Sequence, residues 1–145
     1  FNWLMPSISG ASILDCFAGT GALGLEALSR GALTCTFVEQ DPQAAKHIHT
    51  NLERFRLHAQ ANLVISDVFE IPREMLIHAD IVFADPPFHC GTSQKFLIWV
   101  KDKMHQDSRL VIECGKHEAL NLEGFEIVKE LKAGIDWLRL LRPVS

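Results

Sequence analysis

The sequence contains no long uncharged hydrophobic stretch that could span a membrane, and it has no excess of basic residues. Its 145 residues include 14 Lys and Arg against 18 Asp and Glu, which gives a net charge of −4. The chain as a whole therefore does not attract polyanions, although its net charge does not exclude a local basic patch. Apolar residues make up 48% of the chain, so intrinsic disorder is excluded too. We expect one domain with its own core.

Cysteine is scarce and widely spaced, at Cys16, Cys35, Cys90 and Cys114. There is no C-x-x-C pair and no cluster of His and Cys at metal-ligand spacing, so we expect neither a metal site nor a disulfide framework. Reduced thiols predict a cytoplasmic protein. The chain opens with apolar residues at 1–5, without an initiator Met or a signal peptide. We expect these residues to end a helix whose beginning lies in an upstream segment that the chain lacks.

Short apolar runs alternate with helical patterns along most of the chain. The expected strands are 12–17, 34–38, 63–65, 80–84 and 109–114, and the expected helices are 22–30, 42–57, 71–76 and 94–104. Gly31 should end the first helix, and Asp41 should cap the second, which begins at Pro42. This alternation is typical of an α/β protein with a Rossmann-like, mostly parallel sheet and helices on both faces.

The alternation stops near the C-terminus. Two further strand candidates, 125–131 and 137–141, are separated by a segment too short for a crossover helix. They should therefore pair as an antiparallel hairpin. The prediction is a seven-stranded sheet that ends in this hairpin.

Acidic residues lie at the ends of four successive predicted strands, at Asp15, Glu39, Asp67 and Asp85. In open α/β sheets ligands bind outside the carboxyl ends of the strands, so these side chains should meet at one edge. Each one alone could simply cap a helix or form a turn. Four at the same edge favour a binding site.

A glycine motif, Gly19-x-Gly21-x-x-Gly24, lies between the first strand and the first helix. Such glycines let the main chain approach a ligand, and Glu39, 20 residues after Gly19, is placed to accept hydroxyls of a ribose. Both NAD and S-adenosylmethionine fit this pattern, and a tight turn without a ligand is the simpler alternative. Asp15 favours S-adenosylmethionine, because a carboxylate there would repel a pyrophosphate and attract ammonium and sulfonium charges.

The tetrapeptide Asp85-Pro86-Pro87-Phe88 follows the fourth predicted strand. Its two prolines lack N–H donors and hold the main chain extended, which leaves carbonyls as acceptors. A carboxylate beside a fixed carbonyl can accept both hydrogens of an –NH₂ group, and Phe88 offers a face on which a planar base can stack. The motif therefore suits an exocyclic amine, although a rigid turn with Phe88 in the core would also explain it.

Residues 15–32, with Asp85-Pro86-Pro87-Phe88, resemble the RsmD-type family of 16S rRNA guanine-N2 methyltransferases, and the resemblance covers nearly the whole chain. It implies the fold of a class I S-adenosylmethionine-dependent methyltransferase over a single domain, 1–145. Members of the family carry a basic segment ahead of the first strand. The implied activity is methyl transfer to the N2 amine of a guanine in small-subunit rRNA. The implied partner is that rRNA or the assembling subunit, and a monomer without metal is expected.

The resemblance also implies roles for individual residues. The catalytic residues it implies are Asp85, Pro86, Pro87 and Phe88. The cofactor-binding residues it implies are Asp15, Phe17, Ala18, Gly19, Thr20, Gly21, Glu39, Gln40, Asp67, Val68 and Asp85. Among these, Asp15 with the glycine loop would hold the methionyl part, Glu39 the ribose, and Asp67 with Val68 the adenine edge.

Three alternatives stay open at this point. The Asp-Pro-Pro-Phe form differs from the Asn-Pro-Pro-Tyr form of enzymes that methylate adenine N6 or protein glutamine, but the same acceptor arrangement serves all of these amines. An NAD(P)-dependent oxidoreductase would explain the glycine motif and Glu39, but not Asp15 or the double proline. A module that binds S-adenosylmethionine or a nucleotide and recognises RNA without modifying it is the non-catalytic possibility. Cys90, His89 and His117 are not expected to take part in catalysis.

Overall fold

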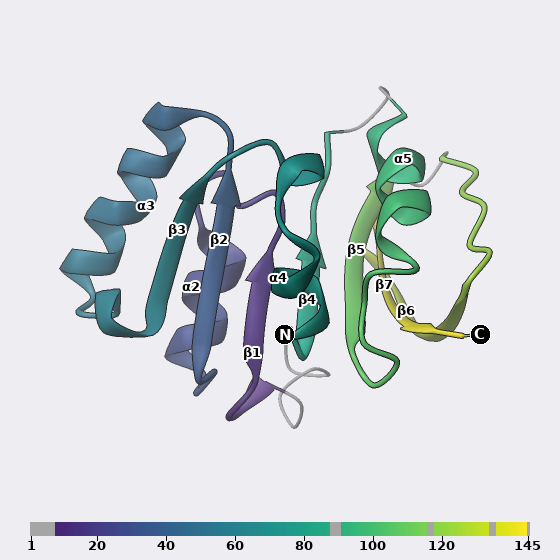
Figure 1. The fold of residues 1–145 in the computed structure, drawn as a ribbon, viewed down its shortest axis with the longest axis horizontal. Coiled ribbons are helices and arrows are strands. Elements are labelled where there is room, and N and C mark those ends of the chain that lie inside the picture. The colour runs from purple at the N-terminus through teal and green to yellow at the C-terminus, as the bar shows by residue number, and fades with distance from the viewer. Residues whose placement is uncertain (1–7, 88–90, 116–117, 134–135, 145) are drawn as a thin grey trace.

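The computed structural model describes residues 8–87, 91–115, 118–133 and 136–144. Its strands are β1 (Ser12–Asp15), β2 (Thr34–Glu39), β3 (Ala61–Ile65), β4 (Ile81–Ala84), β5 (Arg109–Gly115), β6 (Phe125–Ala133) and β7 (Asp136–Pro143). Its helices are α2 (Ala22–Ser29), α3 (Pro42–Arg54), α4 (Arg73–Ile77) and α5 (Thr92–Val100), with short 3-10 helices at His58–Gln60 and Val68–Glu70. The predicted alternation of strands and helices is confirmed (Figure 1).

The seven strands form one sheet in the order β3-β2-β1-β4-β5-β7-β6. Strands β1 to β5 pair in parallel, whereas β7 is antiparallel to both β5 and β6. The predicted mostly parallel sheet with an antiparallel C-terminal hairpin is therefore confirmed. The strand order reverses between β1 and β4, and this is where a sheet of this kind opens a crevice for a ligand.

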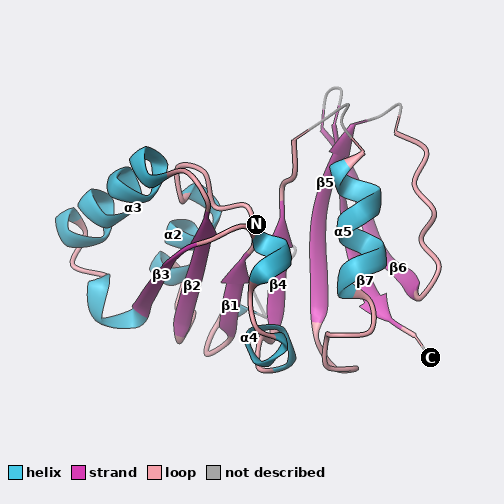
Figure 2. Ribbon diagram, turned by 45° about the horizontal axis from the view of Figure 1, so that its top comes forward, coloured by secondary structure: helices cyan, strands magenta, loops and turns pink. Residues whose placement is uncertain are grey.

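Both faces of the sheet are buried under helices. Because side chains alternate along a strand, neighbouring Ile13 and Leu14 lie in separate hydrophobic clusters. The cluster of Leu14 includes Phe96 from α5 and Leu76 from α4, and the cluster of Ile13 includes residues of α2 and α3. Figures 1 and 2 show α4 and α5 in front of the sheet and α2 behind it. Helices cover both faces, as predicted.

Helix α3 ends three residues earlier than the predicted 42–57, at Arg54. Arg56 has a positive φ of 57°, and the amide of Leu57 donates to the carbonyl of Leu52 over 2.8 Å. This is the Schellman arrangement that usually places glycine at the left-handed position. The sequence pattern missed the end because an arginine takes that position here.

Two other helices begin at residues other than those predicted. Helix α4 begins at Arg73 rather than at Ile71, because the residue before Pro72 is held in an extended conformation. Helix α5 begins at Thr92, directly after the left-handed Gly91, and ends at Val100 rather than at residue 104.

Cys16, Cys35 and Cys114 are buried free thiols, and Cys90 lies outside the described residues. Residues 1–5, expected to end a helix, lie outside them as well. Among the residues that the structure describes, no helix has the length and apolar character needed to cross a membrane.

Candidate functional site

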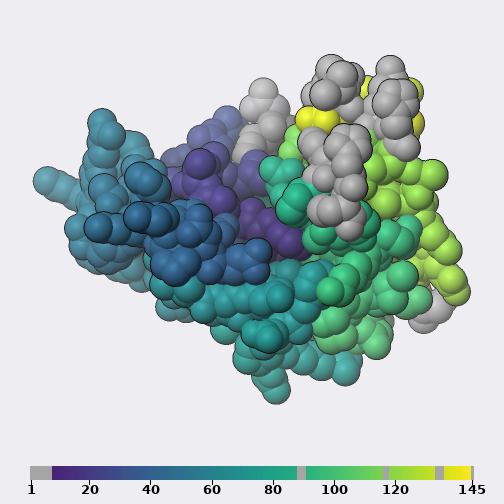
Figure 3. Space-filling view, turned by 90° about the horizontal axis from the view of Figure 1, so that it is seen from above, coloured from purple at the N-terminus to yellow at the C-terminus, as the bar shows by residue number. Residues whose placement is uncertain are grey.

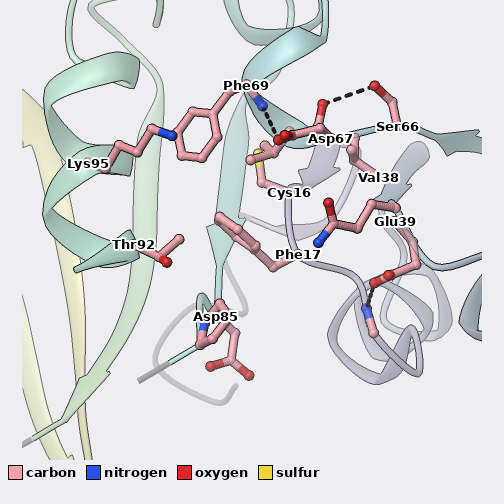
Figure 4. Close-up of a pocket in the computed structure, with 14 residues that line it drawn as sticks. Cys16, Phe17, Val38, Glu39, Ser66, Asp67, Phe69, Asp85, Thr92 and Lys95 are labelled. Carbon is pink, nitrogen blue, oxygen red and sulfur yellow. Dashed lines mark hydrogen bonds between the residues drawn. The ribbon is translucent and has the colours of Figure 1, made fainter. Parts of the chain in front are cut away.

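The loops that follow β1, β2, β3 and β4 lie at the carboxyl edge of the sheet, which is uppermost in Figure 1. Figure 3 looks onto this edge, where surfaces of segments far apart in the sequence meet. A cavity of about 430 Å³ opens there. Its lining, drawn in Figure 4, consists of Cys16, Phe17, Gly19, Val38, Glu39, Gln40, Ser66, Asp67, Val68, Phe69, Asp85, Pro87, Thr92 and Lys95.

The three glycines of the motif have different structural roles. Gly19 lines the cavity and has a φ of 55°, a left-handed conformation that favours glycine. Gly21 also has a positive φ, and a Cβ there would lie 3.1 Å from Ile48. At Gly24 a Cβ would lie 2.3 Å from the ring of Phe37, so this glycine is required for close packing of α2 on β2. Only the first glycine therefore belongs to the cavity wall.

Glu39, at the end of β2, joins two loops of the site. One carboxylate oxygen accepts a hydrogen bond from the amide of Gly19 and the other accepts from the amide of Asp41, each over 2.8 Å. Each oxygen has two lone pairs, so both can still accept a further hydrogen bond. Glu39 thus holds the glycine loop in place and presents acceptors to the cavity.

Asp15, at the end of β1, is 1% exposed, and neither of its carboxylate oxygens has a hydrogen-bond partner within the described part of the chain. Burial raises the pKa of Asp15 to about 7. The nearby main-chain amides of Gly24 and Phe17 oppose this rise, and the negative charges of Asp85 and Glu39 add to it. Asp15 is not among the residues that line the cavity. A buried carboxyl group without a partner is costly, and a cationic group bound nearby would stabilise its charged form.

Asp67 and Val68 form the part of the wall that follows β3. The Asp67 carboxylate accepts from the amide of Phe69 over 3.0 Å and so caps a short 3-10 helix. The hydroxyl of Ser66 donates to the Asp67 carbonyl over 2.9 Å (Figure 4). These bonds fix the main chain beside the cavity.

The double-proline corner follows β4, whose four residues are all buried. Asp85 is exposed and lines the cavity together with Pro87, whereas Pro86 is buried. Phe88, the fourth residue of the predicted catalytic set, lies outside the described residues. The corner therefore places a carboxylate beside the cavity on a rigid base.

The structure brings together most of the predicted site residues and adds others. Asp15, Ala18, Thr20, Gly21 and Pro86 are not among the described lining residues. The cavity is also lined by six residues that the sequence did not predict, Cys16, Val38, Ser66, Phe69, Thr92 and Lys95. The Lys95 ammonium lies 4.2 Å from the centre of the Phe69 ring. In the sequence, the one feature that could have placed Lys95 near the site is that its predicted helix follows the double proline.

Metal binding was not expected from the sequence. Within the ranges that the structure describes, no group of three or more His, Cys, Asp and Glu side chains is arranged to hold a metal ion.

A family model described as Conserved hypothetical protein 95 matches residues 1–142. The chain is 35% identical over 147 residues to the Ribosomal RNA small subunit methyltransferase D of Haemophilus influenzae, a match that covers 97% of this chain and 76% of that protein. It is 40% identical over 102 residues to the protein of the same name from Escherichia coli K12, which covers 70% of this chain and 51% of the relative. The chain thus spans about half to three quarters of these relatives.

Solved structures show the same fold. One from Haemophilus influenzae, described as a "putative methylase", superimposes with a TM-score of 0.85 at 33% identity, over 100% of this chain and 94% of the other. An RNA methyltransferase from Salinibacter ruber, solved in complex with S-adenosyl-L-homocysteine, gives a TM-score of 0.81 at 14% identity, over 99% of this chain and 90% of the other. The sheet described above is therefore that of class I methyltransferases.

Proposed function

The chain belongs to the family described as Conserved hypothetical protein 95, the RsmD-type family that its sequence resembles, and from this membership we propose that it methylates the N2 amine of a guanine in small-subunit rRNA. Two relatives are named as small-subunit rRNA methyltransferases, which supports the RNA substrate. The choice of guanine N2 rests on the resemblance and on the double-proline corner beside the cavity.

S-adenosylmethionine is the methyl donor, and when bound it supplies an activated methyl group on a positively charged sulfur. The site fits such a molecule, because Glu39 presents carboxylate acceptors to the cavity. The buried Asp15 carboxyl group, at the end of β1, has no hydrogen-bond partner among the described residues and suits a nearby cation. Glu39 would accept from the ribose hydroxyls, and Asp67 with Val68 would meet the adenine edge. The same Asp15 carboxylate opposes a dinucleotide, whose pyrophosphate it would repel.

Asp85 and the main-chain carbonyl of Pro86 orient the target amine. The lone pair of an exocyclic amine is delocalised into the ring, so the nitrogen must be drawn toward a tetrahedral geometry before it can attack a methyl group. Two acceptors that take its two hydrogens direct the lone pair at the methyl carbon. Positioning of this kind lowers barriers by about 7 to 11 kcal/mol, so a strong base is not required. The proton that the methylated amine loses goes to Asp85 or to water.

Phe88 would stack on the target base and hold it outside a helix, as enzymes that modify bases do. Its position directly after Pro87 supports this role.

One observation carries the proposal. Asp85, at the end of β4, lines the same cavity as Gly19 and Glu39, across the point where the strand order reverses. A cofactor held by the first two loops would therefore have its reactive end beside the acceptor for the amine.

The test is methyl transfer from radiolabelled S-adenosylmethionine to small-subunit rRNA, offered both as naked RNA and within the subunit, followed by digestion and mass spectrometry of the nucleosides. We expect N2-methylguanosine, and we expect Asp85→Ala to abolish it while S-adenosylmethionine still binds. Phe88→Ala should lower turnover in the same way.

Other products would overturn the proposal in different ways. Formation of N6-methyladenosine, or of methylated glutamine in a protein substrate, would show that the enzyme methylates a different amine. Binding of the cofactor with no product on either form of the RNA would favour a recognition module. Loss of cofactor affinity in Asp85→Ala, with unchanged turnover at saturation, would contradict the role given to Asp85.

A further inference from the structure

Asp85 has a neighbouring carboxyl group on β5, the strand next to β4 in the sheet. Strands β4 and β5 are parallel, and Ala84 lies opposite Ile112. The next residues along, Asp85 and Glu113, therefore lie side by side, with Asp85 directly after the end of β4 and Glu113 two residues before the end of β5. Because side chains alternate, Glu113 faces the same side of the sheet as Val111, two residues earlier.

The two carboxyl groups interact directly. A hydrogen bond with Asp85, followed by burial and by the charges of Asp85 and Asp136, raises the pKa of Glu113 to about 7. A carboxylate has no proton to donate, so a hydrogen bond between two carboxyl groups requires that one of them is protonated. Below about pH 7 the Glu113 carboxyl group is therefore mostly protonated and can donate this hydrogen bond.

The other charged groups around Glu113 can be assigned from the register. On β7, Asp136 lies opposite Gly115 and Leu138 lies opposite Glu113, so the Asp136 carboxyl is on the same face. Arg139 is the nearest cation along β7, but it points to the other face and pairs with Glu130 over 2.8 Å. Among the described residues, the groups that act on Glu113 are thus both acidic.

This arrangement leads to one inference, which rests on the function proposed above. We propose that Glu113 is a positioning residue, whose protonated carboxyl group donates a hydrogen bond to Asp85 and so directs the free carboxylate oxygen of Asp85 toward the target amine. Asp85 is exposed and follows the last residue of its strand, so its own main chain does not fix the orientation of its carboxylate.

The consequence is a dependence on pH. Below about pH 7 the Glu113 carboxyl group keeps its proton and the bond to Asp85 is intact. As the pH rises through about 7, Glu113 ionises, the bond is lost and the two carboxylates repel each other. Methyl transfer should therefore decline as the pH rises above about 7. Cofactor binding should not decline, because Glu113 does not line the cavity.

The test compares Glu113→Gln and Glu113→Ala with the unmodified protein in the methyl-transfer assay. We expect kcat of the unmodified protein to fall roughly 15-fold between about pH 7 and pH 8.5, as the titration of one group requires. Glutamine keeps a donor that does not titrate, so kcat of Glu113→Gln should stay level over this range. Glu113→Ala should lower kcat at every pH and leave the Kd for S-adenosylmethionine unchanged.

Glu126→Gln is the matched control, because Glu126 pairs with Arg142 at the far end of the sheet. It should keep the pH profile of the unmodified protein. If Glu113→Gln keeps that profile too, the inference is wrong although the proposed function stands. If no guanine is methylated by the unmodified protein, the proposed function itself fails.

A second measurement needs no substrate. The carboxyl carbon of Glu113, followed by NMR in the protein alone, should titrate near pH 7. In Asp85→Asn it should titrate at a lower pH, because the amide can donate to the Glu113 carboxylate and the negative charge is removed. Titration at an unchanged pH in Asp85→Asn would show that the two carboxyl groups do not interact, and would overturn the inference.

Discussion

Asp15 combines two properties at one residue, deep burial and a carboxyl group without a hydrogen-bond partner among the described residues. Its pKa of about 7 in the folded state lies above the value near 3.9 expected in the unfolded chain. The folded state therefore binds the proton more tightly. This contribution to stability is complete below about pH 4, is lost as the pH rises toward about 7, and does not change further above it.

Asp15→Asn should remove this pH dependence. Since one pKa unit corresponds to about 1.4 kcal/mol, the unmodified protein should lose a few kcal/mol of its free energy of unfolding between pH 4 and pH 7 relative to the variant. Urea denaturation at several pH values measures the difference. If the free energy of unfolding depends on pH in the same way in the two proteins, the pKa of Asp15 does not differ between the folded and unfolded states.

Glu39 is tied by hydrogen bonds to the amides of Gly19 and Asp41, so its replacement affects the cavity wall as well as the ligand. Glu39→Ala should weaken binding of S-adenosylmethionine by about 1.5 to 3 kcal/mol, the size of a charge-assisted hydrogen bond. Calorimetric titration gives the Kd, and Glu53→Ala on the exposed face of α3 is the control. An unchanged Kd in Glu39→Ala would remove this residue from the binding site.

At the scale of elements, α2 and α3 end in the same way with different residues. Gly31, with a φ of 101°, follows α2, and its amide donates to the carbonyl of Leu28 over 3.1 Å. Arg56 takes the equivalent position after α3 with a φ of 57°. The glycine was a usable signal and the arginine was not, so the first helix end was predicted and the second was placed too late.

Arg56→Gly should stabilise the protein by about 1 kcal/mol, because glycine adopts a left-handed conformation without the steric cost of a side chain. Urea denaturation measures the change, and the affinity for S-adenosylmethionine should stay the same. The contrasting variant is Lys46→Gly, on the exposed side of α3, which should destabilise by about 1 kcal/mol. A loss of stability in Arg56→Gly would mean that the arginine side chain makes a contact that outweighs the strain.

At the scale of the whole molecule, the cavity is built from loops that follow four strands, and a bound ligand would connect them. S-adenosylmethionine at about 100 times its Kd should raise the free energy of unfolding by about 2.7 kcal/mol, since it binds only the folded state. Thermal denaturation with and without the ligand detects this shift, and NADH at the same concentration should give none. An equal shift with NADH would favour the dinucleotide alternative.

The sequence alone determined the elements and the edge at which they meet. Hydrophobic periodicity, glycine and proline are local signals, and they were enough to predict the parallel sheet, the terminal hairpin and the acidic strand ends Asp15, Glu39, Asp67 and Asp85. They also carried the family resemblance, which the comparisons confirmed.

Only the tertiary structure decided which of these residues line the cavity and what else stands beside them. Gly21 and Gly24 pack against Ile48 and Phe37, residues distant in sequence, so the motif by itself could not separate the binding glycine from the packing ones. Glu113 lies within β5, two residues before its end, and nothing in the sequence pattern singled it out. Its interaction with Asp85 depends on the register between β4 and β5. Burial and strand register are set by contacts between distant segments, and both the pKa of a carboxyl group and the identity of its neighbours follow from them.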